Sequence, residues 1–167
     1  MTFHTFIESP LGQMLLMSDG EHVTGLHFQS DKYMPPVGAD WIRDDRHALL
    51  VEAAAQVGRY FAGGLTRFDL PIAPSGTAFQ QLVWNALCAI PHGTTESYGE
   101  LARRIGQPTA SRAVGAANSR NPISIIVPCH RVIGADGSLT GFGGGEPAKR
   151  WLLDHEARTV GQRLAGF

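Results

Sequence analysis

A short segment rich in proline and small residues divides this sequence into two parts of different character. It reads Pro-Ile-Ala-Pro-Ser-Gly over residues 71–76, and proline and glycine at this density indicate a linker. The apolar runs before it resemble strands and one helix, whereas most of those after it have helical spacing. A chain of 167 residues is long enough for two small domains. We therefore expect one domain over residues 1–76, including the linker, and a second over residues 77–167.

The first part predicts a small α/β domain with an antiparallel sheet. Turn sequences separate three apolar runs of strand length, which are Phe3–Ile7, Gln13–Met17 and Val23–Phe28. Residues 30–44 contain two prolines and a glycine and are expected to form a loop. Helical spacing over Arg46–Phe61 predicts a helix that ends at two glycines. Phe68–Leu70 is expected to add a strand.

The second part predicts helices. Three are expected, each preceded by a Ser or Thr that can cap it: Ala78–Ala89 after Thr77, Tyr98–Ile105 after Ser97, and Ala110–Ser119 after Thr109. A short turn with Gly106 separates the last two, which is the spacing of a helix-turn-helix. Helix pairs are also common in proteins that bind no DNA. A last helix is expected over Pro147–Ala157.

A cysteine follows the most apolar segment of the second part. Ile123–Val127 is rich in β-branched residues and predicts a buried strand that leads into Cys129. A free cysteine is most often a small buried apolar residue, but the neighbouring His130 and Arg131 favour a reactive thiolate. Successive strand residues point to opposite faces, so His130 would reach the thiol through a water. Glu156 is one acceptor that could orient His130, and Cys88 is expected to be inert core.

The helix expected at residues 110–119 has mostly small side chains. Gly115 costs helix stability, about 1 kcal/mol relative to alanine, and close packing against another helix is one explanation. The alternative is a smooth helix that approaches a narrow groove, with Arg112 as its single long side chain. The charge favours a polyanion partner for this part: residues 78–167 hold nine Lys/Arg against six Asp/Glu, whereas residues 1–77 hold five against nine.

Several classes of protein are excluded by composition. Two cysteines are too few for a disulfide scaffold or an all-cysteine zinc site, and the spacing of His, Cys, Asp and Glu fits no zinc site. No apolar run approaches the roughly 20 residues of a membrane span, and residues 1–4 do not begin a secretory signal. We expect a protein of the reducing cytoplasm that uses neither metal nor cofactor and does not contact membranes.

The segment Pro128-Cys129-His130-Arg131-Val132 resembles the active-site signature of the O6-alkylguanine-DNA alkyltransferases, also called methylated-DNA–protein-cysteine methyltransferases. Further motifs at the family's spacing extend the resemblance over residues 79–156, and one more lies at the start of the first domain. They are Ser97-Tyr98-Gly99-Glu100, Arg112-Ala113-Val114-Gly115, Asn121-Pro122, Trp151-Leu152-Leu153 and Ser9-Pro10-Leu11-Gly12.

This resemblance implies a C-terminal winged helix-turn-helix domain that repairs double-stranded DNA by direct reversal. A flipped guanine would transfer its O6 alkyl group irreversibly to Cys129, so that each molecule acts once. The catalytic set it implies is Cys129, His130, Glu156, Tyr98 and Asn121. The alkylguanine pocket would be lined by Val132, Leu139, Phe142, Gly143 and Tyr98. The minor groove would be contacted by Arg112, Ala110, Ala113, Gly115, Ser119 and Tyr98.

Two departures from the family and three alternative functions accompany this interpretation. Position 142 is Phe where many members have Tyr, and residues 1–77 lack the cysteines of the zinc site that some members carry. The alternatives are a non-catalytic lesion-binding relative, in which the cysteine is lost, a winged-helix regulator, and a cysteine hydrolase. Cys129 argues against the first. We expect a monomer, and cooperative binding along DNA stays open.

Overall fold

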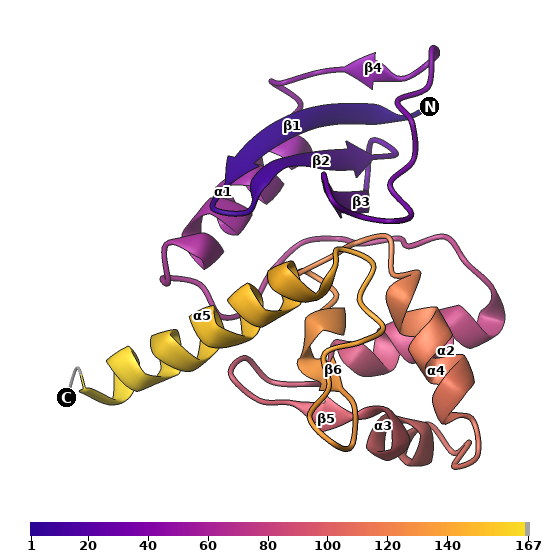
Figure 1. Cartoon of the computed structure of the whole chain (residues 1–167). Helices are drawn as coiled ribbons and strands as arrows, with labels where there is room; N and C mark the ends of the chain where they lie inside the picture. Colours follow the sequence, from indigo (N-terminus) through magenta and orange to yellow (C-terminus); the bar gives the residue numbers. More distant parts are fainter. Residues whose placement is uncertain (166–167) are drawn as a thin grey trace.

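The computed structural model describes residues 1–165, which form two domains joined by one connecting segment (Figure 1). The N-terminal domain is a four-stranded sheet of order β3-β2-β1-β4, with one helix packed against it. Its strands are β1 (Phe3–Ser9), β2 (Gly12–Ser18), β3 (Val23–Phe28) and β4 (Ile42–Arg43). The first three form an antiparallel meander, as predicted. The two-residue β4 runs parallel to β1 within the expected loop, and two residues are too few to show an alternating pattern.

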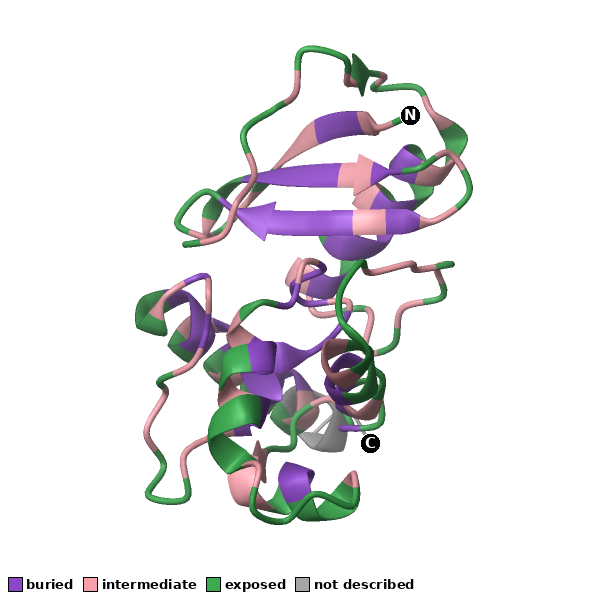
Figure 2. Cartoon of the chain, turned by 90° about the vertical axis from the view of Figure 1, so that its right-hand side faces the viewer, coloured by how far each residue is buried: buried purple, intermediate pink, exposed green. Residues whose placement is uncertain are grey.

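Helix α1 (Ala48–Phe61) covers one face of this sheet. Its buried side chains include Leu50, Ala53, Val57 and Tyr60, which recur at the spacing of one helix face. Figure 2 shows that β2 and β3 of the neighbouring sheet are mostly buried. The sheet and α1 therefore share a core, and the last buried residue of the helix, Tyr60, lies at the end nearest the C-terminal domain (Figure 1).

The strand expected at Phe68–Leu70 is absent, because a side chain takes the place of a partner strand. The amide of Gln56 accepts from the Asp69 backbone N–H and donates to the Asp69 carbonyl, both at 2.9 Å. The linker then pairs with β3: Val23 donates to the Pro71 carbonyl at 2.8 Å. The first half of the linker is therefore fixed to the N-terminal sheet.

The C-terminal domain is mainly helical. Its elements are α2 (Ala78–Leu87), β5 (Glu96–Ser97), α3 (Tyr98–Arg104), α4 (Ser111–Ser119), a 3-10 turn η1 (Cys129–Arg131), β6 (Val132–Ile133) and α5 (Glu146–Ala165). The predicted caps at Thr77 and Ser97 are present, and each forms a capping box with the residue three positions on. Helices α3 and α4 form the helix-turn-helix, and the loop between β6 and α5 is the wing beside it (Figure 1).

One boundary each of α1, α2 and α3 differs from the sequence prediction by one or two residues, and two further differences concern α4 and α5. Ala110, not Thr109, is the N-cap of α4, and its side chain forms no capping bond. Helix α5 continues to Ala165, past the expected end at Ala157, because no glycine or proline interrupts it before Gly161. None of the helices within residues 1–165 has the length and apolar character that a membrane crossing requires.

The expected strand over Ile123–Val127 is instead a tight turn. Val127 donates to the Ile123 carbonyl at 3.0 Å, and Ile125 has a φ of 72°, which is unfavourable for a β-branched residue. Only the start of this segment pairs with a strand: Leu26 of β3 donates to the Pro122 carbonyl at 2.9 Å, and Ser124 donates back to Leu26 at 3.0 Å. The segment before the cysteine is therefore attached to the N-terminal sheet.

Candidate active site

Cys129 lies in the 3-10 turn η1 and not at a strand end. The residue is 3% exposed, and burial raises the pKa of its thiol to about 11, which the Asn121 side chain only partly opposes. The sequence predicted that His130 and Arg131 favour a thiolate, but burial has the larger effect on the thiol pKa and raises it. The cysteine is therefore a thiol at neutral pH, and a base must remove its proton during any reaction.

His130 and Glu156 form a short and fully buried polar contact. The imidazole Nε2 donates to Glu156 Oε2 across 2.6 Å, and the two side chains are 0% and 1% exposed. Burial lowers the pKa of His130, and the carboxylate of Glu156 opposes that shift. The imidazole is therefore neutral, with its proton on Nε2.

Three groups besides His130 donate hydrogen bonds to the carboxylate of Glu156. Arg131 donates from Nε to Oε1 at 2.8 Å and from Nη2 to Oε2 at 3.1 Å, and the Gly93 N–H donates to Oε1 at 3.2 Å. The Tyr60 hydroxyl, which belongs to the N-terminal domain, donates to Oε2 at 2.7 Å. His92 Nδ1 lies 4.0 Å from the same oxygen. Burial alone would raise the pKa of Glu156, but His130 and Arg131 hold it well below its usual range.

Gly93 is the one position of this network that requires glycine. Its φ is +80°, and a Cβ there would stand 2.4 Å from a methyl group of Val160. The loop after α2 can therefore pass close to α5 and present the Gly93 N–H to the carboxylate only without a side chain.

The second ring nitrogen of His130 is left available as a proton acceptor. Nδ1 is buried and forms no hydrogen bond with another described residue. Because Nε2 carries the ring proton, Nδ1 bears a lone pair. A base oriented by a carboxylate and placed next in sequence to a thiol has the elements that nucleophilic catalysis by cysteine requires.

Tyr98 and Lys149 meet on the other side of the cysteine segment. The Tyr98 hydroxyl donates to the Thr140 carbonyl at 2.5 Å. Lys149 is 0% exposed and donates to the Val132 carbonyl at 2.5 Å and to Tyr98 Oη at 3.4 Å. Burial raises the pKa of Tyr98 to about 12 and lowers that of Lys149 to about 8. Sequence reasoning missed Lys149, since an isolated lysine on a helix is usually exposed.

Two asparagines fix the backbone around the cysteine. Asn118, which is fully buried in α4, donates to the carbonyls of Cys129 and Gly141, both at 3.1 Å. Asn121 donates to the Val127 carbonyl at 2.8 Å and accepts from the Ile123 N–H at 3.0 Å. Asn121 thus holds the turn before Cys129, while Asn118, which the sequence analysis did not single out, ties the helix-turn-helix to the cysteine and to the wing.

The residues expected to line a base pocket lie on β6 and the wing. Val132 and Phe142 are buried, and Leu139 and Gly143 are half-buried. The ring of Phe142 packs on Phe28 of β3, with centroids 6.0 Å apart. The N-terminal domain also holds the wing's backbone, since Lys32 donates from its N–H to the Gly143 carbonyl at 2.8 Å and Ser30 donates from its hydroxyl to the Gly144 carbonyl at 2.7 Å.

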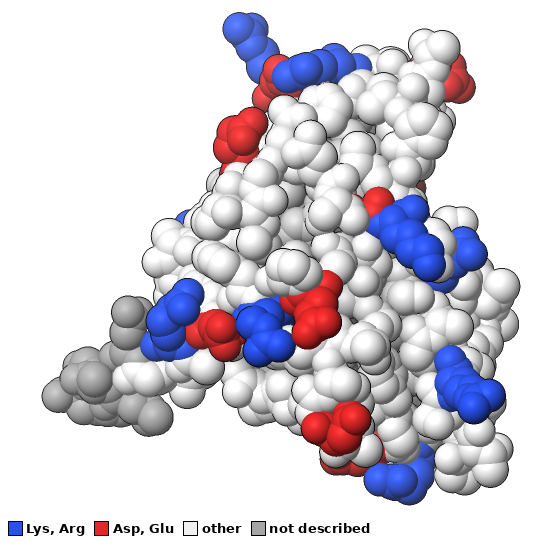
Figure 3. Space-filling model, viewed as in Figure 1, with Lys and Arg blue, Asp and Glu red and all other residues white. Residues whose placement is uncertain are grey.

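Helix α4 presents a surface of small side chains. Arg112 and Ala113 are exposed, and Ala110, Gly115 and Ser119 are half-buried. A Cβ on Gly115 would lie 3.8 Å from the Tyr98 ring, which is ordinary contact, so crowding does not require glycine there. Figure 3 shows Lys and Arg side chains along the edge of the molecule that carries α3 and α4.

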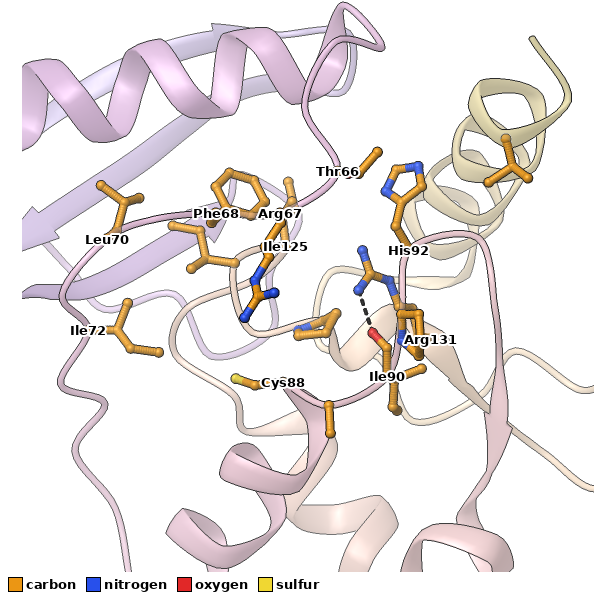
Figure 4. A pocket seen from close by; sticks show the side chains of 15 residues that line it. Thr66, Arg67, Phe68, Leu70, Ile72, Cys88, Ile90, His92, Ile125 and Arg131 are labelled. Atoms are coloured by element: carbon orange, nitrogen blue, oxygen red, sulfur yellow. Dashed lines mark hydrogen bonds between the residues drawn. The ribbon is translucent and has the colours of Figure 1, made fainter. Parts of the chain in front are cut away.

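A separate cavity of about 650 Å³ lies between the two domains. Figure 4 shows Phe68 and Leu70 of the connecting segment on one side and His92 and Arg131 on the other. The cavity borders the outer side of the Glu156 network, and its lining does not include Cys129, Tyr98 or Phe142. Both ring nitrogens of His92 are buried, so they do not face the cavity. No cluster of metal-ligating side chains is present within residues 1–165.

A winged helix-turn-helix domain that holds a buried cysteine, next in sequence to a carboxylate-oriented histidine, is the arrangement of a DNA-binding protein with a candidate reactive cysteine. Two family models match nearly the whole chain: the 6-O-methylguanine DNA methyltransferase ribonuclease-like domain over residues 2–74 and the DNA binding domain of the same family over residues 78–158. The chain belongs to this methyltransferase family, whose members repair DNA by alkyl transfer to their own cysteine.

Individual relatives agree with this assignment along their whole length. The methylated-DNA–protein-cysteine methyltransferase of Methanosarcina acetivorans is 49% identical over 92% of this chain and 97% of its own. That of Mycobacterium leprae is 49% identical over 96% of both. The crystal structure of Mycobacterium tuberculosis OGT in complex with DNA superposes with a TM-score of 0.87 at 47% identity, covering 94% of each chain.

Proposed function

We propose that Cys129 is the alkyl acceptor and that one molecule accepts one alkyl group from O6 of guanine. The sulfur attacks the alkyl carbon, a C–S bond forms, and the C–O6 bond breaks with its electron pair left on the guanine. The thioether product has no leaving group better than the one just displaced, so the protein acts once. This displacement needs neither metal nor cofactor.

The observation that carries the proposal is the His130–Glu156 pair next to the buried thiol. A water between the thiol and Nδ1 passes the proton of Cys129 to His130, whose positive charge Glu156 then stabilises. Since the pKa of the free thiol is raised to about 11, this base supplies the thiolate at neutral pH.

Tyr98 and Lys149 are proposed to act on the leaving group. The Tyr98 hydroxyl donates a proton to the guanine as the C–O6 bond breaks, and Lys149, 3.4 Å away, stabilises the resulting phenolate. Val132, Leu139, Phe142 and Gly143 are proposed to line the base pocket, and Asn121 to hold the turn that aims Cys129.

The base reaches the pocket by flipping out of the duplex. We propose that α4 enters the minor groove with its small residues Ala110, Ala113 and Gly115, and that Arg112 fills the gap in the base stack. Ser119 and Tyr98 contact the adjacent backbone. We expect a monomer that acts in the reducing cytoplasm, where two free thiols persist.

Mass spectrometry after incubation with a duplex containing O6-methylguanine tests the proposal. The peptide with Cys129 should gain one methyl group, at one equivalent per molecule. Cys129→Ser should gain none, whereas Cys88→Ser should react as the natural chain does. Cys88 is the other free thiol, and it is exposed, not part of the core as the sequence predicted. More than one equivalent transferred would indicate a hydrolase, and an unmodified Cys129 would indicate a regulator or a lesion-binding protein.

A further inference from the structure

We infer that Tyr60 of the N-terminal domain is a positioning residue for the reaction at Cys129, acting through Glu156 on His130. This inference rests on the proposed function. Its basis is that the Tyr60 hydroxyl and His130 Nε2 donate to the same carboxylate oxygen, Oε2, at 2.7 and 2.6 Å. The first domain thereby contributes a donor to the proton-transfer chain of the second.

The side chain of Tyr60 is held rigidly in this position. It is 0% exposed, and its ring meets those of Phe61, Phe68, His92 and His155 at centroid distances of 5.2 to 6.1 Å. The backbone is fixed as well, because His155 Nε2 donates to the Tyr60 carbonyl at 2.7 Å. Two adjacent residues of α5 therefore bind Tyr60, His155 at its carbonyl and Glu156 at its hydroxyl. Among the described residues, Glu156 is the only acceptor of that hydroxyl.

The chemical effect of this hydroxyl follows from its role as a donor. Burial, followed by the nearby Glu156 charge, raises the pKa of Tyr60 far above its usual range, so it remains protonated and can only donate. A donor on Oε2 draws negative charge away from the oxygen that also accepts His130. It therefore lowers the basicity of the imidazole relative to a pair without it.

The other charged and titratable groups around the pair are the same with or without this hydroxyl. Arg131 from η1, His92 from the loop after α2, and His155 from α5 surround the carboxylate or the Tyr60 ring. Lys149 of α5 adds a weaker positive influence on His130. Removal of the Tyr60 hydroxyl alone thus leaves the charges in place and changes one hydrogen bond.

The test is the pH dependence of single-turnover transfer by the full chain. For Tyr60→Phe we expect the midpoint on the acidic side of the rate-versus-pH profile to move to higher pH by about 0.5–1 unit. Loss of one hydrogen bond to Glu156 should raise the pKa of His130 by this amount. Phe61→Leu is the matched control, because it disturbs the same ring cluster without touching Glu156, and its midpoint should stay in place. Site-specific 3-fluorotyrosine at position 60, a stronger donor of the same shape, should move the midpoint to lower pH.

Other outcomes are equally decisive. If Tyr60→Phe loses stability but keeps the natural midpoint, Tyr60 only packs the interface and the inference is wrong. If Tyr60→Phe does not fold, the fluorinated protein decides: an unmoved midpoint overturns the inference. The imidazole pKa of His130, followed by NMR in the same proteins, needs no transfer at all. If the pKa of His130 shifts in the same directions while Cys129 gains no methyl group, the effect of Tyr60 on His130 is supported and the proposed function is rejected.

Discussion

Glu156 accepts a hydrogen bond of 2.6 Å from His130 Nε2, and both side chains are shielded from solvent. Folding therefore fixes a neutral imidazole and an ionised carboxylate side by side. The pKa values of both groups are lowered, so the folded state binds fewer protons than the unfolded chain wherever the unfolded groups titrate. That relation determines how the protein responds to acid.

We expect stability to fall on acidification in two stages. His130 contributes stability above its unfolded pKa of about 6.5, which is lost as the pH falls below that value, and Glu156 does the same below about 4.3. Urea midpoints should stay constant from pH 8 to about pH 7 and decline from there to pH 4. His22→Gln, at an exposed histidine, should leave the curve unchanged. A flat curve between pH 6.5 and pH 5 would contradict the assignment.

Arg112→Ala should strongly slow repair within a duplex but barely affect transfer from the free base O6-benzylguanine, which needs no extrusion. Single-turnover rates at saturating duplex provide the measurement. Arg103→Ala, on an exposed residue of α3, is the control for general charge. If Arg112 only neutralised a phosphate, affinity for all DNA would fall and the salt slope would drop by about one unit.

Gly115→Ala should separate stability from DNA binding. The new methyl group has room beside Tyr98, so the free energy of unfolding should rise by about 0.5–1 kcal/mol. If α4 enters a narrow groove, the same methyl group should weaken binding to duplex DNA. Thermal unfolding and fluorescence anisotropy with a labelled duplex measure the two effects. Unchanged affinity would place the groove contact elsewhere on α4.

Phe142→Tyr should speed transfer from methylated DNA by about tenfold or less, because one neutral hydrogen bond to the base contributes only about 0.5–1.5 kcal/mol. Affinity for unmodified duplex should not change. Stopped-flow rates with both duplexes provide the comparison. An equal rate would mean that the pocket uses the ring alone, held as it is against Phe28.

Much of the fold follows from local sequence signals. The meander of β1 to β3 and the helix caps at Thr77 and Ser97 were predicted because turns and caps depend on neighbouring residues. The prediction at Ile123–Val127 was wrong because a β-branched run normally favours a strand. Here Asn121 supplies hydrogen bonds to both ends of the segment and folds it into a turn, and no pattern in the run itself indicates that.

The sequence predicted the outline of the candidate site. It did not indicate the residues whose place in the site depends on partners far away in the sequence. Cys129 and its neighbours are recognisable in the sequence, but Lys149 is buried only because carbonyls of β6 and the wing surround its amine. Tyr60 lies 96 positions from Glu156, and its helical spacing marks it only as a core residue.

The linker at residues 71–76 is the natural place to separate the two domains into fragments, but hydrogen bonds cross between the domains and would be lost. A fragment that starts at Thr77 would keep every residue of the reactive set yet lose the phenol that shares Glu156 with His130. It would also lose the β3 backbone that pairs with Pro122 and Ser124. An N-terminal half without this phenol would therefore alter the proposed chemistry at Cys129, so the linker joins two parts of the chain that depend on each other.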